Sequence, residues 1–146
     1  MTQSIAEIMT EKLETIFISS SSQDAAKKMR DKDVSSLVVT DNNKKPIGIL
    51  TERDLVRKIC AYDINSRDVL IKDILSSPLL TIDSKLSLEE AANAMIHNKV
   101  RHLLVVDSTI DRPIGIITAT DFASYLKENV DMDEVNTKIL ESLKEP

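Results

Sequence analysis

A tandem repeat constrains the fold of this chain more than any other feature of its sequence. The only two glycines in 146 residues stand at the same place in two copies of one phrase, residues 46–54 (PIGILTERD) and 113–121 (PIGIITATD). Segments on both sides of the phrase also match, and one polar loop differs by a single residue. Because units of this size bury little surface alone, the sequence predicts two similar units that share one core.

The two copies have the same order of predicted elements. Capping-box spacing, Ser21 with Asp24 and Ser87 with Glu90, begins a helix in each copy. Short runs rich in β-branched residues predict the strands, which are residues 15–19, 36–40, 47–50, 80–83, 102–107 and 114–117. Residues expected to face inward from the closing helices are Leu55, Val56, Ile59, Phe122, Ala123 and Leu126. The order β-α-β-β-α, given twice, predicts an α/β fold.

Composition excludes several function classes. The net charge of -5 and the pI of about 5.1 argue against nucleic-acid binding. The sequence has no apolar run long enough for a membrane span and no signal peptide, so we expect a soluble, cytoplasmic protein. A single cysteine, Cys60, excludes an internal disulfide framework. Glycine-rich phosphate loops and metal-ligand spacings are missing, so we predict no enzyme activity and no metal.

The repeated phrase has the chemistry of a nucleotide contact. A glycine lets a ligand or a facing chain approach the backbone. The threonine after the strand caps a helix whose free N–H groups favour an anion. The aspartate three residues later can accept hydrogen bonds from two vicinal hydroxyls, as acidic residues do with ribose in other nucleotide folds. These residues are Gly48, Thr51 and Asp54 in the first copy and Gly115, Thr118 and Asp121 in the second.

The same pattern also has a purely structural interpretation. Thr-x-x-Asp is a capping box in which the carboxylate accepts from the backbone N–H of the cap residue. The two interpretations are compatible, because an empty site can use the aspartate as a cap that a ligand then displaces.

At residues 5–129 the chain resembles a pair of CBS domains, the regulatory module named after cystathionine β-synthase. The phrase Gly-hydrophobic-x-Thr-x-x-Asp is similar to the adenosyl-binding motif of that family, and both copies are complete. The resemblance implies a CBS pair, or Bateman module, with pseudo-two-fold symmetry and clefts that draw on both repeats. The chain departs from the family at Val38 and Leu104, where many members have proline, so that a backbone N–H is restored at each position.

The resemblance also implies further ligand contacts. Basic residues at the edge of the second strand meet phosphate in the family, so Arg101 and His102 are candidates, together with Arg53 inside the first motif. Few aromatic residues are present, so recognition of a base would be aliphatic. The candidates are Ile16, Ile82, Val34 and Val100, with backbone groups near Thr15 and Thr81; each aliphatic residue is equally suited to a core.

The function that these features predict is a regulatory, non-catalytic sensor of AMP, ADP or ATP that acts on an unknown effector protein. The alternatives are an interaction module without a nucleotide and a sensor of S-adenosylmethionine or NAD. We predict CBS repeats at residues 1–66 and 67–129 and an amphipathic helix or tail at 130–146. The resemblance and this tail together predict a homodimer.

Overall fold

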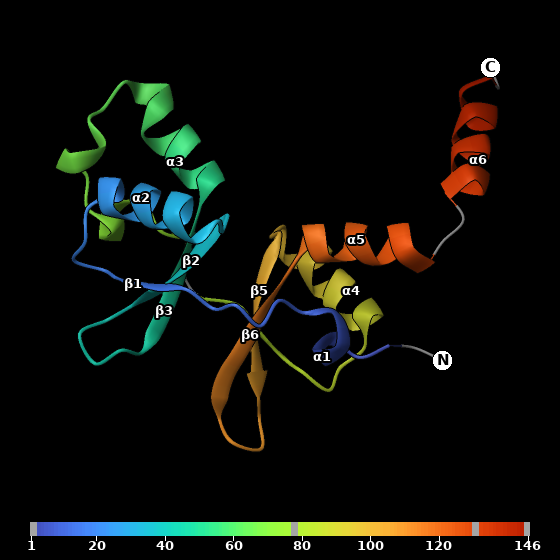
Figure 1. Ribbon diagram of the computed structural model, residues 1–146, viewed down its shortest axis with the longest axis horizontal. Helices are drawn as coiled ribbons and strands as arrows, with labels where there is room; N and C mark the ends of the chain where they lie inside the picture. Colours follow the sequence, from blue (N-terminus) through green and yellow to red (C-terminus); the bar gives the residue numbers. More distant parts are fainter. Residues whose placement is uncertain (1–2, 77–78, 130–131, 145–146) are drawn as a thin grey trace.

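The computed structural model describes residues 3–76, 79–129 and 132–144, and each repeat forms its own three-stranded sheet (Figure 1). In the first sheet, β1 (Thr15–Phe17) pairs parallel with β2 (Ser36–Thr40), which pairs antiparallel with β3 (Pro46–Thr51). The second sheet repeats this order with β4 (Thr81–Asp83), β5 (His102–Asp107) and β6 (Arg112–Thr118). The predicted tandem α/β fold is confirmed.

Helices complete the two repeats and extend beyond them. They are α1 (Ile5–Ile8), α2 (Ser22–Lys32), α3 (Glu52–Lys58), α4 (Leu88–Asn98), α5 (Ala119–Asn129) and α6 (Met132–Lys144), with short 3₁₀ turns at Cys60–Tyr62, Ser66–Asp68 and Ile71–Asp73. Helix α6 points away from the two repeats (Figure 1). Within the described residues, no helix is long and apolar enough to cross a bilayer.

The helix starts follow the predicted caps in part. Ser87 and Glu90 form the complete reciprocal box at α4. At α2 the Ser21 hydroxyl accepts from the Asp24 N–H at 3.1 Å, and this is the one bond of the predicted capping box that forms there.

The two repeats bury two core clusters, and each cluster contains residues from outside its own repeat. Ile71 and Ile74, which follow the first repeat's closing helix, lie in the core beneath α2. Ile5 of α1 lies in the core of the second repeat, although the predicted first unit, residues 1–66, includes it. The prediction of one shared core is therefore wrong; the repeats instead exchange core residues through their leading segments.

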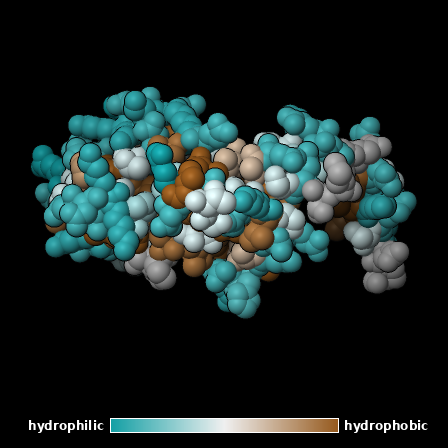
Figure 2. All heavy atoms as spheres, turned by 90° about the horizontal axis from the view of Figure 1, so that it is seen from below, coloured by the Kyte–Doolittle hydropathy of each residue, from teal (hydrophilic) through white to brown (hydrophobic). Residues whose placement is uncertain are grey.

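The closing helices bury fewer residues than their sequence predicts. Val56 is 58% exposed and Leu126 is 48% exposed, whereas Ile59 is buried. Residues 55 and 59 are about one turn apart and share the inward face, while residue 56 is rotated by roughly 100° from residue 55. Apolar surface accordingly remains on the outside of both closing helices. Figure 2, which views the molecule from below, shows further hydrophobic side chains around its middle.

Two backbone bridges attach the leading segment of each repeat to the sheet of the other. Thr10 exchanges both hydrogen bonds with Ile116 of β6, each 2.9 Å long. Ser76 does the same with Ile49 of β3, at 2.9 and 3.1 Å. We call residues 9–10 and 75–76 the crossing segments.

The glycines lie directly beneath these crossing segments. A Cβ at Gly115 would lie 2.7 Å from the Thr10 carbonyl oxygen, and one at Gly48 would lie 2.8 Å from the Ser76 carbonyl oxygen. Neither glycine has a positive φ. The missing side chain therefore makes room for a facing chain, which was one of the two roles considered for these glycines.

We predict that Gly48→Ala and Gly115→Ala each destabilise the protein by about 1–3 kcal/mol, because the new methyl group meets backbone that is held by two hydrogen bonds. Urea unfolding measures the change. Ala123→Ser, an added atom on an exposed face of α5, is the control. A loss below about 0.5 kcal/mol for both glycine variants would show that the crossing segments move aside at little cost.

Candidate functional site

Both motif aspartates are capping residues in the structure. Asp54 Oδ2 accepts from the Thr51 N–H at 3.0 Å and from its hydroxyl at 3.1 Å, and the Thr51 hydroxyl oxygen accepts from the Asp54 N–H at 3.2 Å. Asp121 and Thr118 form the same three bonds, at 2.9, 3.2 and 3.2 Å. The capping interpretation is confirmed at both positions.

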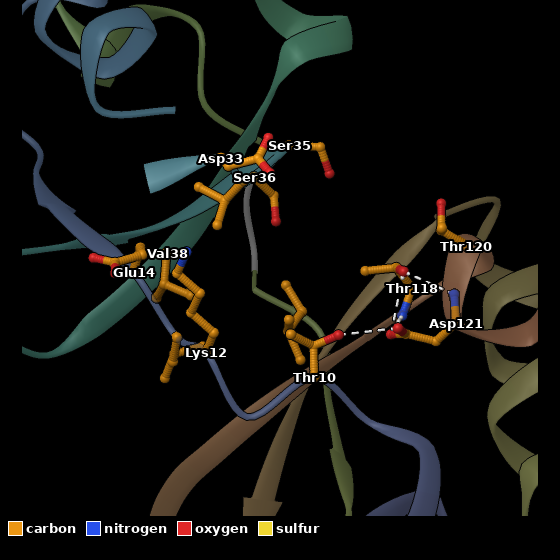
Figure 3. Close-up of a pocket in the computed structure, with 13 residues that line it drawn as sticks. Thr10, Lys12, Glu14, Asp33, Ser35, Ser36, Val38, Thr118, Thr120 and Asp121 are labelled. Carbon is orange, nitrogen blue, oxygen red and sulfur yellow. Dashed lines mark hydrogen bonds between the residues drawn. The ribbon is translucent and has the colours of Figure 1, made fainter. Parts of the chain in front are cut away.

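The second carboxylate oxygen has a different partner in each repeat. Asp54 Oδ1 lies 3.2 Å from the Lys58 ammonium, which also donates to the Ile74 carbonyl at 2.8 Å. Asp121 Oδ1 accepts from the Thr10 hydroxyl at 2.9 Å (Figure 3). Each motif aspartate is thus tied to a segment that leads into a repeat, directly in one case and through a lysine in the other.

The two motifs open into two separate clefts between the repeats. Cleft 1, with a volume of about 200 Å³, joins the second motif to the first repeat's strand edge, and its walls include Thr10, Leu13, Glu14, Val34, Ser36, Ile116, Thr118 and Asp121. Cleft 2, of about 490 Å³, joins the first motif to the second repeat's edge, and its walls include Ile49, Thr51, Asp54, Leu79, Leu80, Lys99, Val100 and His102. Each cleft draws on both repeats, as the resemblance implies.

The predicted phosphate contacts gather in one cleft. Arg53 comes from the first repeat, and Arg101 with His102 comes from the second, yet all three line cleft 2. Lys99 adds a cation that the sequence analysis did not single out. Sequence comparison of the repeats shows Arg53 and Arg101 as features of different copies, and only the opposed packing of the copies brings them together.

The predicted base contacts divide into two groups. Val34 lines cleft 1 and Val100 lines cleft 2. Ile16 and Ile82 are buried in the two cores instead. Thr15 and Thr81 are exposed at the starts of β1 and β4, and the cleft walls are formed by the residues just before them, among them Leu13, Glu14, Leu79 and Leu80.

The departure from the family's proline explains why the residues before β1 and β4 have fixed positions. The Val38 N–H donates to the Glu14 carbonyl at 2.9 Å, and the Leu104 N–H donates to the Leu80 carbonyl at 3.0 Å. Proline lacks this donor. The restored N–H groups therefore lengthen each parallel ladder at the rim of a cleft.

His102 is the titratable group with a shifted pKa in cleft 2. Burial lowers the pKa of its imidazole, and the positive charge of Arg101 acts in the same direction, while the carboxylates of Asp54 and Asp121 oppose both. Because the net direction is downward from an ordinary value near 6.5, the imidazole is neutral at pH 7. It can then both donate and accept a hydrogen bond.

In the part of the chain that the structure describes, no group of three or more His, Cys, Asp or Glu side chains is arranged to hold a metal ion. Cys60 is exposed, and His97 lies on the exposed face of α4.

Comparison with known proteins identifies the family. The CBS domain model matches residues 5–61 and 71–128, so the chain belongs to the CBS-domain family. A CBS pair indicates a regulatory, non-catalytic module.

Relatives of this chain include two uncharacterized archaeal proteins. One, from Methanopyrus kandleri, is 38% identical over 96 residues, and the match covers 66% of this chain and 48% of that protein, so the chain spans about half of its length. The other, a 17.7 kDa protein of Acidianus ambivalens, is 30% identical over 128 residues, which are 86% of this chain and 74% of the relative.

A solved structure has the same architecture. The hexameric CBS-CP12 protein from bloom-forming cyanobacteria superimposes with a TM-score of 0.77 at 27% identity, covering 92% of this chain and 81% of that one.

We predict that His102 makes the protein less stable in mild acid. Since its folded-state pKa is lowered, the unfolded chain binds more protons once the pH falls to about 6.5, and the free energy of unfolding decreases with falling pH. Urea unfolding of the wild type and of His102→Gln from pH 7.5 downward should show a smaller decrease in the variant. His97→Gln is the matched control; equal pH dependence in all three proteins would contradict the prediction.

Proposed function

We propose that this protein is a regulatory adenine-nucleotide sensor that binds AMP, ADP or ATP between its two repeats. The observation that carries the proposal is the grouping of Arg53, Lys99 and Arg101 around a cleft that also contains a threonine-capped helix start and Asp54. Guanidinium groups and helix N-termini favour phosphate, and a carboxylate can accept from ribose hydroxyls. Aliphatic residues at the rim, such as Val100, provide a surface for a base.

The position of the clefts supplies the regulatory step. A ligand in cleft 2 would contact Thr51 of one repeat and His102 of the other, so its affinity would depend on how the repeats are placed. A ligand shifts a conformational equilibrium by its differential affinity for the two states. Nucleotide binding would therefore change the arrangement of the repeats, and an effector protein would bind one arrangement more tightly than the other.

An interaction module without a nucleotide is the second candidate. It is favoured by two observations: both motif aspartates complete a capping box, and both glycines make room for a crossing segment. S-adenosylmethionine and NAD share the adenosine group, so they belong to the same ligand panel.

We predict that at least one of AMP, ADP, ATP, S-adenosylmethionine and NAD stabilises the protein. A ligand present at 100 times its dissociation constant adds about 2.7 kcal/mol to the free energy of unfolding. Thermal shift identifies the ligand, and calorimetry gives its affinity. If none binds at millimolar concentration, the sensor function is wrong and the interaction module takes its place.

Substitution of one cleft cation should weaken a phosphate-bearing ligand selectively. Arg101→Gln is expected to raise the Kd of such a nucleotide at least tenfold, since hydrogen bonds to charged groups contribute about 1.5–3 kcal/mol. Arg112→Gln, on the exposed start of β6, is the matched control and should leave the Kd unchanged. Equal affinity in both variants would remove Arg101 from the site.

We further propose that the chain forms a homodimer through the α4–α5 surface. Ile96 is 75% exposed beside a groove of about 310 Å³ that Met95 and Phe122 also line. Self-association of the hexameric CBS-CP12 protein supports assembly in this fold. Sedimentation should show a dimer that Ile96→Glu dissociates and Ile110→Glu, on an exposed turn, does not. A monomer at all concentrations would contradict this assignment.

A further inference from the structure

Given the adenine-nucleotide function proposed above, we infer that the two clefts are not equivalent: Thr10 occupies the ribose-binding position of cleft 1, and the chain binds one nucleotide, in cleft 2. Thr10 acts as a specificity-determining residue because its hydroxyl takes the place of a ligand hydroxyl on Asp121. The inference rests on three features that differ between the clefts: the partners of the aspartates, the charges and the volumes.

The partner of Asp121 lies inside the cleft. Thr10 and Asp121 both line cleft 1, and the hydroxyl donates to Asp121 Oδ1 at 2.9 Å (Figure 3). Its position needs no ligand to order it, since the Thr10 backbone is already held by both hydrogen bonds to Ile116. A ribose hydroxyl that approached Asp121 from the cleft would have to compete with this donor for the same carboxylate oxygen.

The arrangement at Asp54 leaves the side toward the cleft open. The second oxygen of this carboxylate, Asp54 Oδ1, faces the Lys58 ammonium, which also donates to the Ile74 carbonyl. Lys58 does not line cleft 2. Ser76, the counterpart of Thr10, lines cleft 2, but among the described residues no hydrogen bond joins its hydroxyl to Asp54. A ligand hydroxyl can therefore reach this carboxylate without displacing a crossing segment.

Charge and size favour the same cleft. The walls of cleft 2 carry three cations and two carboxylates, whereas those of cleft 1 carry one cation, Lys12, and three carboxylates, Glu14, Asp33 and Asp121. The walls of cleft 2 would therefore attract a phosphate more strongly than those of cleft 1. Cleft 2 is also the larger, at about 490 Å³ against about 200 Å³.

Site-resolved amide NMR of the full chain tests the inference. Titration of the wild type with AMP is expected to shift the amide signals of Ile49 and Thr51 and to leave that of Leu13, which lines cleft 1 alone, unchanged. In Thr10→Val, which keeps the β-branched shape and the backbone bridge, adenosine should also shift the Leu13 signal. We expect the Kd of adenosine for cleft 1 to be about tenfold lower in Thr10→Val than in the wild type. Adenosine is used because it has no phosphate for the acidic cleft to repel.

Thr10→Ser keeps the hydroxyl and should behave as the wild type, and Thr15→Val is the control for loss of an exposed threonine near the clefts. A shift of the Leu13 signal in the wild type with AMP would overturn the inference, as would a Leu13 signal that does not respond to adenosine in Thr10→Val. If no adenosyl ligand shifts any amide, the nucleotide function itself is wrong, and that outcome is distinct from binding in the other cleft.

Discussion

Two pairs of backbone hydrogen bonds join the two repeats to each other. They join Thr10 to Ile116 and Ser76 to Ile49, so that the segment entering each repeat is attached to the sheet of the other. Each bridge requires a strand residue without a Cβ, because the crossing carbonyl lies where that atom would be. Apolar residues of both leading segments are buried in the opposite cores, and this burial adds to the attachment. The relative position of the sheets consequently depends on two glycines.

The same attachment creates the clefts and makes residues of both repeats line each of them. Because each leading segment crosses to the other sheet, a motif from one repeat faces the second-strand edge of the other, and no cleft belongs to a single unit. Lys58 extends this connection, since its ammonium contacts both Asp54 and the Ile74 carbonyl. A change in the position of the Asp54 carboxylate would therefore alter the contacts of the segment that leads into the second repeat. In the proposed function, ligand binding at Asp54 and the response of the crossing segment would use these same contacts.

The sequence was sufficient for the fold because its signals are local and occur twice. Strand runs, caps and the order of elements all follow from neighbouring residues, and the structure confirms them except at α2, where only one bond of the predicted capping box forms. The grouping of Arg53 with Arg101 could not be predicted, since it depends on how two copies pack and not on either copy. The sequence also did not predict which residues line the rim of cleft 1. The Val38 N–H donates to the Glu14 carbonyl, so the residues just before Thr15, and not Thr15 itself, form the cleft wall. The sequence allowed Gly48 to make room either for a ligand or for a facing chain. The structure identifies the facing chain, residues 75–76.

The two motif aspartates share the partners of one carboxylate oxygen and differ in the partner of the other. We call Oδ2, which caps the helix, the inner oxygen and Oδ1 the outer oxygen. The inner carboxylate oxygens make the same three capping bonds in both repeats, and these bonds fix the helix starts. The outer oxygens meet residues that differ: a lysine one turn along the helix beside Asp54, and a threonine from the crossing segment beside Asp121. Because tyrosine stands at the position in α5 that Lys58 has in α3, the second repeat has no such cation. A duplicated motif can thus keep its capping function in both copies while the partner of the second carboxylate oxygen differs between them.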